Sequence, residues 1–364
     1  MSFFSMQKEK YAVFGIHEST IKPTDSDRET MNRLNIKLLE PIHPFSISAP
    51  VQTIKAIFQL NAVIKENKID LVHILFATPH ALWGNFISIP YIITTRGSDV
   101  LIVIPDLLMR KGVKAFYFRL LFHLFRRVFN RAASITATSN RQIAKIKELF
   151  SKDSALIRTG ISVNEIKAIN KPELLPSELL QQSYIFSPRF MSPVYNISLQ
   201  IQSLVFLDEL ILQKYLFVFI RGKSFNVDYF TEQCQKLEQL KNEKGLKYLI
   251  IDFFDQETLW MAFKRASLTI MTPLSDGTPN SALEAMAAEC PLIIPHFDYD
   301  ADIFDGATFV LEENEPEQLA LLIEKAIIAY PKSMIDLASD RILRLGNRKT
   351  EMKRLEEIYN IATS

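Results

Sequence analysis

The sequence contains few cysteines and few glycines. Its 364 residues include two cysteines, Cys234 and Cys290, and ten glycines. The two cysteines are far apart and lack the spacing of a zinc site or a disulfide framework, which favours a reducing compartment. Gly15, near the end of the first predicted strand, stands alone before "IHEST", so the G-x-G-x-x-G turn of a nicotinamide-dependent dehydrogenase is absent. The sequence therefore argues against a disulfide-rich scaffold, a metal site and a dinucleotide-dependent dehydrogenase.

Neither sign of charge dominates, and long apolar runs are lacking. The chain has 42 basic and 41 acidic residues and a net charge of +1, so no global field favours nucleic acid. No window approaches about 18 uninterrupted apolar residues, and the N-terminus lacks the pattern of a secretory signal. We expect a cytoplasmic protein that does not span the membrane. Peripheral attachment to the inner face of the cytoplasmic membrane stays open.

What the chain does have is hydrophobic content, at 48%. Short apolar runs alternate with helical patterns, which is typical of parallel sheets covered on both faces by helices. The predicted strands are 11–16, 36–39, 71–76, 91–95, 134–138, 155–157, 184–187, 216–220, 247–251, 268–271 and 291–295. The predicted helices are 51–66, 106–131, 140–150, 196–207, 228–242, 258–265 and 280–288.

A proline-containing segment, 170–183, interrupts this rhythm without a strand and is the predicted linker. We expect two domains, at 1–172 and 173–364. A last helix near 335–361 is expected to cross back to the first domain.

The stretch "SDGTPNSALEAMAAECP", residues 275–291, combines a loop with the start of a helix. Thr278 is the predicted N-cap and Pro279 the first helical residue. The N–H groups of Asn280 and Ser281 then form an anion site at the positive end of the helix dipole. Glu284, one turn further, can accept hydrogen bonds from two neighbouring hydroxyls, and Asp276 in the loop can accept others. This geometry suits a nucleotide diphosphate carrying a sugar. A turn aspartate and an exposed helical glutamate are the plainer alternative.

The same string resembles the signature of the retaining family 4 glycosyltransferases (group 1) of the GT-B fold. In that signature an acidic residue, seven spacer residues and a glutamate precede "AMA" and a strand, and Asp276 and Glu284 have this spacing. The resemblance implies that Glu284 holds the donor ribose and that Asp276 holds hydroxyls of the donor sugar. It also implies that the amides of Asn280 and Ser281 hold the diphosphate. Gly277 and Thr278 join them in the donor-binding loop.

The resemblance extends over roughly residues 70–364. It implies two Rossmann-like domains with parallel sheets facing across a cleft, and a nucleotide diphosphate sugar as donor. Arg189 after the strand 184–187 would contact the donor phosphates, because a guanidinium reaches two phosphate oxygens at once. The stretches that carry the resemblance are "KIDLVHILFATPHALWG", "YIITTRGSDV", "SITATSNRQIAKIKELF", "ALIRTGIS", "YIFSPRFMSPVYNISLQIQSLVFL", "LTIMTP" and "FVLEENEPEQLALLIEKAI".

Three departures from the family pattern concern charge and glycine. The family usually has a lysine shortly after the arginine, where this chain has Val194 and Tyr195, and Lys223 is the candidate replacement. Arg96 stands where the family often has a histidine near the donor sugar. It can bind a phosphate or an acidic sugar but cannot act as a base. A glycine-rich loop after the first strand is missing.

Residues 106–131 suggest a membrane surface. They hold a single acid, Asp106, and interleaved aromatic residues. Such a helix can lie on an anionic membrane, and it can equally be a buried helix whose charges reach out to solvent. A membrane location suits a lipid-linked acceptor. The basic residues are Arg110, Lys111, Lys114, Arg119, Arg126, Arg127 and Arg131.

The resemblance implies a retaining, metal-independent glycosyltransferase that moves a sugar from a nucleotide diphosphate sugar to an acceptor hydroxyl. It also implies that the domain 1–172 binds the acceptor and that the domain 173–364 binds the donor. The expected acceptor is a lipid-linked or surface-polysaccharide glycan, and no further cofactor is expected. The alternative is a non-catalytic GT-B subunit that binds a partner glycosyltransferase, which the missing lysine, histidine and glycine loop would explain.

Overall fold

The computed structural model describes residues 49–364, apart from 67, 113–114, 223–225, 275, 277 and 297–299, together with the strands 13–16 and 37–38 near the N-terminus. The chain forms two compact units, Met1–Thr159 with Lys349–Ser364, and Gly160–Arg348. The division therefore falls at 159/160, whereas the sequence placed it at 172/173. The chain passes from one unit to the other twice.

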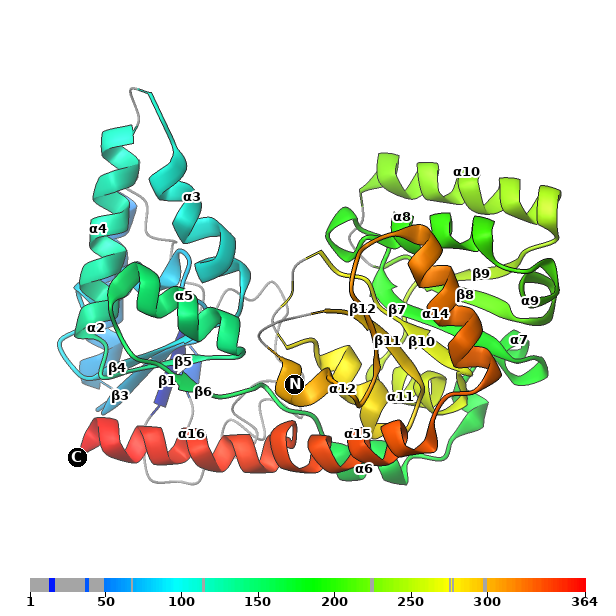
Figure 1. Ribbon diagram of the computed structural model, residues 1–364. Helices are drawn as coiled ribbons and strands as arrows, with labels where there is room; N and C mark the ends of the chain where they lie inside the picture. Colours follow the sequence, from blue (N-terminus) through cyan, green and yellow to red (C-terminus); the bar gives the residue numbers. More distant parts are fainter. Residues whose placement is uncertain are drawn as a thin grey trace. The chain divides into compact units, whose positions relative to one another are not determined.

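The first unit contains a parallel six-stranded sheet in the order β2-β1-β3-β4-β5-β6 (Figure 1). Its strands are β1 (Val13–Ile16), β2 (Lys37–Leu38), β3 (Leu71–Ile74), β4 (Tyr91–Thr95), β5 (Ser134–Ala137) and β6 (Ala155–Leu156). Its helices are α2 (Pro50–Glu66), η1 (His80–Asn85), η2 (Asp99–Val103), α3 (Ile104–Met109), α4 (Ala115–Arg131), α5 (Asn140–Phe150) and most of α16 (Arg348–Thr363).

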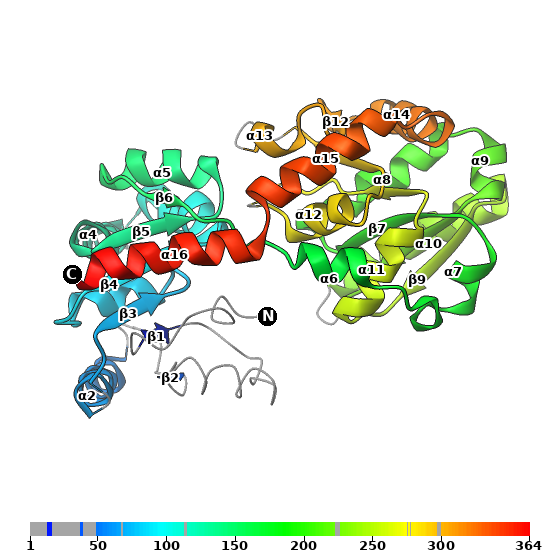
Figure 2. The ribbon, with the colours of Figure 1, turned by 90° about the horizontal axis from the view of Figure 1, so that it is seen from below.

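Both faces of this sheet are covered, because successive side chains of a strand point to opposite sides. Val72 and Ile93 belong to the apolar core beneath α2, α4 and α5. Leu71 and Ile92 belong to a second cluster, to which α16 contributes Met352, Leu355 and Tyr359. Figure 2 shows α16 lying across the strands of this unit.

Two predicted helices are broken in the structure. Residues 106–131 span the end of α3 and all of α4, and Gly112 between them has φ +88°, which a helix does not accommodate. The last predicted helix, 335–361, is α15 (Lys332–Leu345) followed by α16, separated at Gly346. Ala338 and Ile342 of α15 pack in the core of the second unit. The chain thus returns to the first unit only through α16.

The second unit also contains a parallel six-stranded sheet, in the order β12-β11-β10-β7-β8-β9. Its strands are β7 (Tyr184–Phe190), β8 (Leu216–Ile220), β9 (Lys247–Ile251), β10 (Leu268–Ile270), β11 (Leu292–Pro295) and β12 (Phe309–Leu311). Its helices are α6 (Val163–Ala168), η3 (Pro172–Leu174), α7 (Ser177–Gln181), η4 (Pro193–Tyr195), α8 (Ile197–Ser203), η5 (Leu204–Phe206), α9 (Glu209–Lys214), α10 (Val227–Lys244), α11 (Gln256–Arg265), α12 (Asn280–Ala287), α13 (Ala301–Phe304), α14 (Pro316–Ile328) and α15.

The predicted linker 170–183 is instead an integral part of the second unit. It contains η3 and α7, and Leu175 and Leu179 are buried in the core of that unit. Two prolines and the absence of a strand made it look like a connection between domains. Its buried leucines show that short helices can cover a sheet without a periodic pattern long enough to detect. The strand β12 was not predicted.

The strand order of the second unit reverses between β7 and β10, which are neighbours in the sheet although β8 and β9 separate them in sequence. Connections leave such a point toward opposite sides of the sheet, so a crevice opens at the carboxyl ends of the two strands. Arg189 lies at the end of β7, and the loop after β10 leads through Asp276 to α12. The fold therefore brings the residues singled out in the sequence to one edge of the sheet.

Candidate functional site

Arg189 is positioned by an irregularity in β7. Ser187 pairs with Phe219 of β8, but the next pair is Phe190 with Ile220. Pro188 and Arg189 therefore form a shift in register, with no residues of β8 opposite them. Pro188 has no N–H to donate to the ladder. A bulge of this kind bends the strand and redirects a side chain. The sequence Pro-Arg at this point thus turns the guanidinium toward the loop that follows β10.

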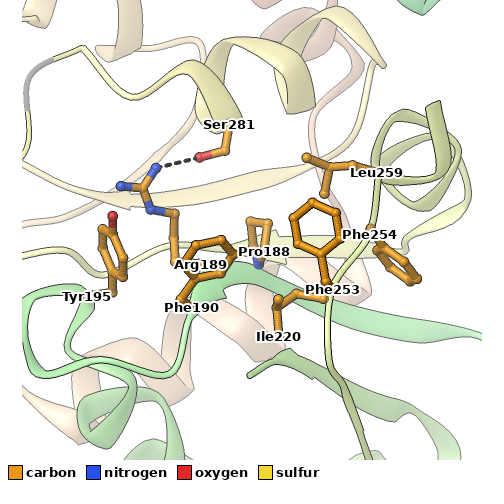
Figure 3. Close-up of a pocket in the computed structure, with 9 residues that line it drawn as sticks. All are labelled: Pro188, Arg189, Phe190, Tyr195, Ile220, Phe253, Phe254, Leu259 and Ser281. Atoms are coloured by element: carbon orange, nitrogen blue, oxygen red, sulfur yellow. Dashed lines mark hydrogen bonds between the residues drawn. The ribbon is translucent and has the colours of Figure 1, made fainter. Parts of the chain in front are cut away.

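The Arg189 guanidinium is the centre of the site. Its Nη2 donates to Asp276 Oδ2 at 2.6 Å, and its Nη1 donates to Ser281 Oγ at 3.1 Å. Its Cζ lies 4.0 Å from the centroid of the Tyr195 ring. Figure 3 shows the side chain extending toward Ser281 with the Tyr195 ring beside it. Arg189 thus links Asp276 in the loop to Ser281 in α12, two of the residues predicted for the site.

The N-cap of α12 lies one residue later than predicted. The helix begins at Asn280, and Pro279 with ψ 117° is the N-cap, without a side-chain cap hydrogen bond. Thr278, predicted as the cap, instead donates from its Oγ1 to Asp300 Oδ1 at 3.0 Å. The N–H groups of residues 282 and 283 return to the carbonyl of Pro279. Those of Asn280 and Ser281 come before them, in the turn whose N–H groups have no acceptor within the helix.

Glu284 is buried on the same helix, with 8% of its surface exposed. Trp260 Nε1 of α11 donates to Glu284 Oε1 at 3.0 Å. Burial raises the pKa of Glu284, while hydrogen bonds from Trp260 and Gln256 and the charges of Arg348 and Arg189 oppose the rise. The plainer alternative, a glutamate on an exposed helical face, therefore does not hold. Burying a carboxylate is costly unless it is hydrogen-bonded or paired, and the donors Trp260 and Gln256 offset part of that cost here.

A pocket of about 200 Å³ opens beside Arg189. Its walls come from the carboxyl ends of β7, β8 and β9 and from the starts of α11 and α12. Two phenylalanine rings, Phe190 and Phe253, are 37% and 43% exposed, which is unusual for side chains of this size beside a core. The residues lining the pocket, all shown in Figure 3, are Pro188, Arg189, Phe190, Tyr195, Ile220, Phe253, Phe254, Leu259 and Ser281.

Gly222 allows this pocket its shape. It follows β8 with φ +87°, and a Cβ there would lie 2.6 Å from Cγ of Phe190. Only glycine combines that backbone angle with so close an approach. The position of the Phe190 ring at the pocket wall depends on this residue.

Arg96 belongs to the first unit, where it follows β4 and is exposed. Its N–H donates to the buried Asp99, whose carboxylate also accepts the N–H groups of Ala77 and Gly97, each at 3.0 Å. Burial raises the pKa of Asp99, and these backbone donors oppose the rise. Asp99 thereby fixes the two loops that follow β3 and β4.

Two predicted donor-binding residues, Gly277 and Lys223, lie outside the described residues. The structure brings together Arg189, Asp276 and Ser281, and it places Glu284 one turn along the same helix. Among the residues that the structure describes, no group of three or more His, Cys, Asp or Glu side chains could hold a metal ion. No helix in the described part of the chain is long and apolar enough to cross a membrane.

Sequence reasoning missed three features of the site, which are the roles of Trp260 and Gln256 and the aromatic pocket. Trp260 is one of only two tryptophans in the chain. A tryptophan in an amphipathic helix, however, usually signals core packing. Phe253 sits in a loop directly after a predicted strand, and an aromatic residue at that place could have been identified as a pocket wall.

Two Rossmann-like units, one with polar and charged groups gathered at its topological switch point, define an α/β protein of the GT-B fold. Comparison with known proteins is consistent with this geometry. Residues 12–139 match the family model described as "Glycosyl transferase 4-like", and residues 176–336 match "Glycosyl transferases group 1". The two matches indicate that the chain is a group 1 glycosyltransferase of the GT-B fold.

Solved structures similar to this chain have the same fold at low sequence identity. A glycosyltransferase from Rickettsia africae has 14% identity and a TM-score of 0.72, covering 97% of this chain and 98% of its own. Anabaena Alr3699/HepE, solved in complex with UDP and glucose, has 13% identity and a TM-score of 0.70, covering 96% of this chain and 99% of its own. A search of curated proteins gave no significant match.

Proposed function

We propose that the protein is a retaining, metal-independent glycosyltransferase that moves a sugar from a nucleoside diphosphate sugar to an acceptor hydroxyl. The observation that carries this proposal is the group formed by Arg189, Asp276 and Ser281 at the switch point, beside an aromatic pocket. The HepE structure, in complex with UDP and glucose, is consistent with such a donor.

Each part of the donor has a matching group in the second unit. The nucleobase stacks in the pocket on Phe253 and Phe190, since aromatic faces bind flat rings favourably. The diphosphate binds Arg189 and the first N–H groups of α12, which combine a planar cation with a helix dipole. Glu284 accepts the ribose hydroxyls, and Asp276 accepts hydroxyls of the transferred sugar. Tyr195 stacks on Arg189 in the region where the family usually has a lysine.

The proposed reaction follows from this arrangement of charge. The acceptor oxygen attacks the anomeric carbon on the face from which the diphosphate leaves, the sugar–phosphate C–O bond breaks, and the acceptor proton passes to the departing phosphate oxygen. The products are a glycoside with retained configuration and a nucleoside diphosphate. Arg189 and the α12 amides stabilise the negative charge that develops on the leaving group. Asp276 holds the sugar in position for attack on that face.

The proposed acceptor is a lipid-linked or surface-polysaccharide glycan at an anionic membrane surface. In the first unit, α3 and α4 lie side by side as a hairpin that extends away from the sheet (Figure 1). Near its end Met109 and Phe116 are 74% and 80% exposed. Arg110, Lys111 and Arg119 are exposed around them, and Arg110 pairs with Asp106 at 2.8 Å, so basic side chains flank the apolar ones. Each such basic residue near an anionic surface contributes about 1 kcal/mol.

Binding to vesicles tests the membrane surface. Wild-type protein should sediment with phosphatidylglycerol vesicles and not with phosphatidylcholine vesicles, and Phe116→Ser combined with Arg119→Glu should abolish binding. Ile328→Ser on α14 is the matched control, because Ile328 is 81% exposed in the second unit. Equal sedimentation of wild type and the double variant would contradict the membrane surface without affecting the donor site.

Thermal unfolding with UDP, GDP, ADP, CMP and dTDP at millimolar concentration tests the donor site. A ligand present at about 100 times its dissociation constant adds roughly 2.7 kcal/mol of stability. One diphosphate should stabilise the wild type and Glu317→Ala, an exposed control on α14, but not Glu284→Ala. The configuration of the sugar first released by slow donor hydrolysis, read by NMR, then tests retention. Stabilisation by none of the nucleotides would favour the non-catalytic subunit that supports a partner glycosyltransferase.

A further inference from the structure

The carboxylate of Glu284 is held in place by the neighbouring helix α11. Trp260 Nε1 donates to Glu284 Oε1 at 3.0 Å, and the side chain of Gln256, one turn earlier on α11, also donates to this carboxylate. Both donors come from one face of α11, since positions four apart lie on the same side of a helix. Two side chains that are not part of the acidic signature therefore determine where its glutamate points.

The contact is rigid on the indole side, because Trp260 and Glu284 are both buried, whereas Gln256 is exposed. Trp260 is 5% exposed and packs in the core of the second unit, and Glu284 is 8% exposed. The helix α11 is itself fixed at its start, where Asp255 accepts the N–H of Thr258 at 2.8 Å. An indole locked by packing can hold a carboxylate in a single orientation, which flexible donors cannot do.

The number of acceptor positions shows what remains for a ligand. An ionised carboxylate offers about four lone-pair positions on its two oxygens. Trp260 and Gln256 occupy two of these, so about two are left. A vicinal diol presents two hydroxyl donors at neighbouring carbons. The partly satisfied carboxylate thus matches the 2′- and 3′-hydroxyls of a ribose in number.

We propose that Trp260, together with Gln256, is a positioning residue that aims Glu284 at the ribose diol and thereby makes the site prefer ribose over 2′-deoxyribose. This inference rests on the proposed donor site in the second unit. The same two donors favour the ionised form of Glu284 against its burial, and only that form accepts both hydroxyls.

Calorimetric titration with matched pairs of nucleotides tests the inference. The probes are UDP, GDP and ADP and their 2′-deoxy counterparts, and the quantity measured is the ratio of the two dissociation constants. Wild type should bind one ribonucleotide roughly tenfold more tightly than its deoxy counterpart, as expected for a hydrogen bond to a charged group. Trp260→Phe keeps the ring packing but loses the N–H. It should reduce the ratio roughly threefold or more.

Tyr184→Phe is the matched control. The Tyr184 hydroxyl donates to the Ala262 carbonyl of the same helix at 2.6 Å, so this variant also removes one buried hydrogen bond from α11. It should lower the thermal unfolding temperature yet leave the ribose preference unchanged. A purely structural role of Trp260 would make the two variants alike in the ratio.

The outcomes separate the inference from the function on which it rests. If wild type binds a ribonucleotide preferentially and Trp260→Phe retains the full ratio, the positioning role is wrong and the donor site stands. If wild type binds a nucleotide without preference for ribose, the role of Glu284 toward the diol is wrong, and the inference with it. If wild type binds dTDP alone, the ribose preference is wrong and the donor site stands; if it binds none of the six nucleotides and neither CMP nor dTDP, the donor site itself is refuted.

Discussion

Asp276 and Arg189 form an ion pair in the site where a negatively charged diphosphate is proposed to bind. Their atoms are 2.6 Å apart, and their side chains are 17% exposed for Arg189 and 23% exposed for Asp276. An incoming phosphate must therefore share the guanidinium with a carboxylate that repels it. We expect Asp276→Asn to bind the nucleoside diphosphate more tightly than wild type does, although Asp276 belongs to the site.

The size of this effect follows from electrostatics. Removing a unit charge about 6 Å from a phosphate, at an effective dielectric constant of about 20, changes the interaction by at most 2 to 3 kcal/mol. The retained amide still accepts from Arg189, and solvent screens part of the field. We therefore expect a gain of about 1 kcal/mol, or roughly fivefold in the dissociation constant.

Arg189→Ala should act in the opposite direction. It removes charge-assisted hydrogen bonds to the phosphates, which are worth about 1.5 to 3 kcal/mol, so affinity should fall roughly 10-fold to 100-fold. Transfer and donor hydrolysis should decrease in both variants, because Asp276 also holds the sugar. Asp276→Asn thus separates nucleotide affinity from turnover.

Isothermal titration with the nucleoside diphosphate that stabilises the wild type, followed by turnover measurements, checks both variants. Weaker binding by Asp276→Asn would show that the carboxylate does not compete with phosphate for Arg189. Unchanged binding by Arg189→Ala would remove the guanidinium from the diphosphate site altogether.

Three further predictions concern stability. Burial raises the pKa of Glu284 above its ordinary 4.5, so the free energy of unfolding should fall as pH rises above about 4.5, and Glu284→Gln should remove that fall in chemical denaturation. Burial, followed by the charge of Arg96, lowers the pKa of His73 from 6.5 to about 3, so stability should be lost as pH falls through this range. The loss should be on the order of 3 to 5 kcal/mol at most, and His73→Gln should reduce it while the exposed control His123→Gln should not. Gly222→Ala should cost about 1 to 3 kcal/mol, because its φ of +87° and the approach to the Phe190 ring leave no room for a Cβ; an unchanged melting temperature would contradict this.

The sequence by itself determined the local elements and the position of the acidic motif on them. The predicted bounds of β4, β8, β9 and α5 agree with the structure residue for residue, because continuous apolar runs and amphipathic periodicity are properties of short windows. The loop and helix carrying Asp276 and Glu284 were also predicted, with the N-cap one residue too early, because the spacing of the two acids is fixed along one segment. Helix breaks at Gly112 and Gly346 were missed, since a single glycine does not interrupt the apolar pattern around it.

Only the tertiary structure decided which distant groups meet. Arg189 and Asp276 are 87 positions apart, and Trp260 and Glu284 are 24 apart, so no local pattern encodes either contact. The first contact arises because β7 and β10 are neighbours in the sheet, and the second because α11 packs against α12. The domain boundary at 159/160 is also decided by contacts between residues far apart in sequence. It depends on Ile161 pairing with Asn347, where two segments of the chain, far apart in sequence, lie side by side.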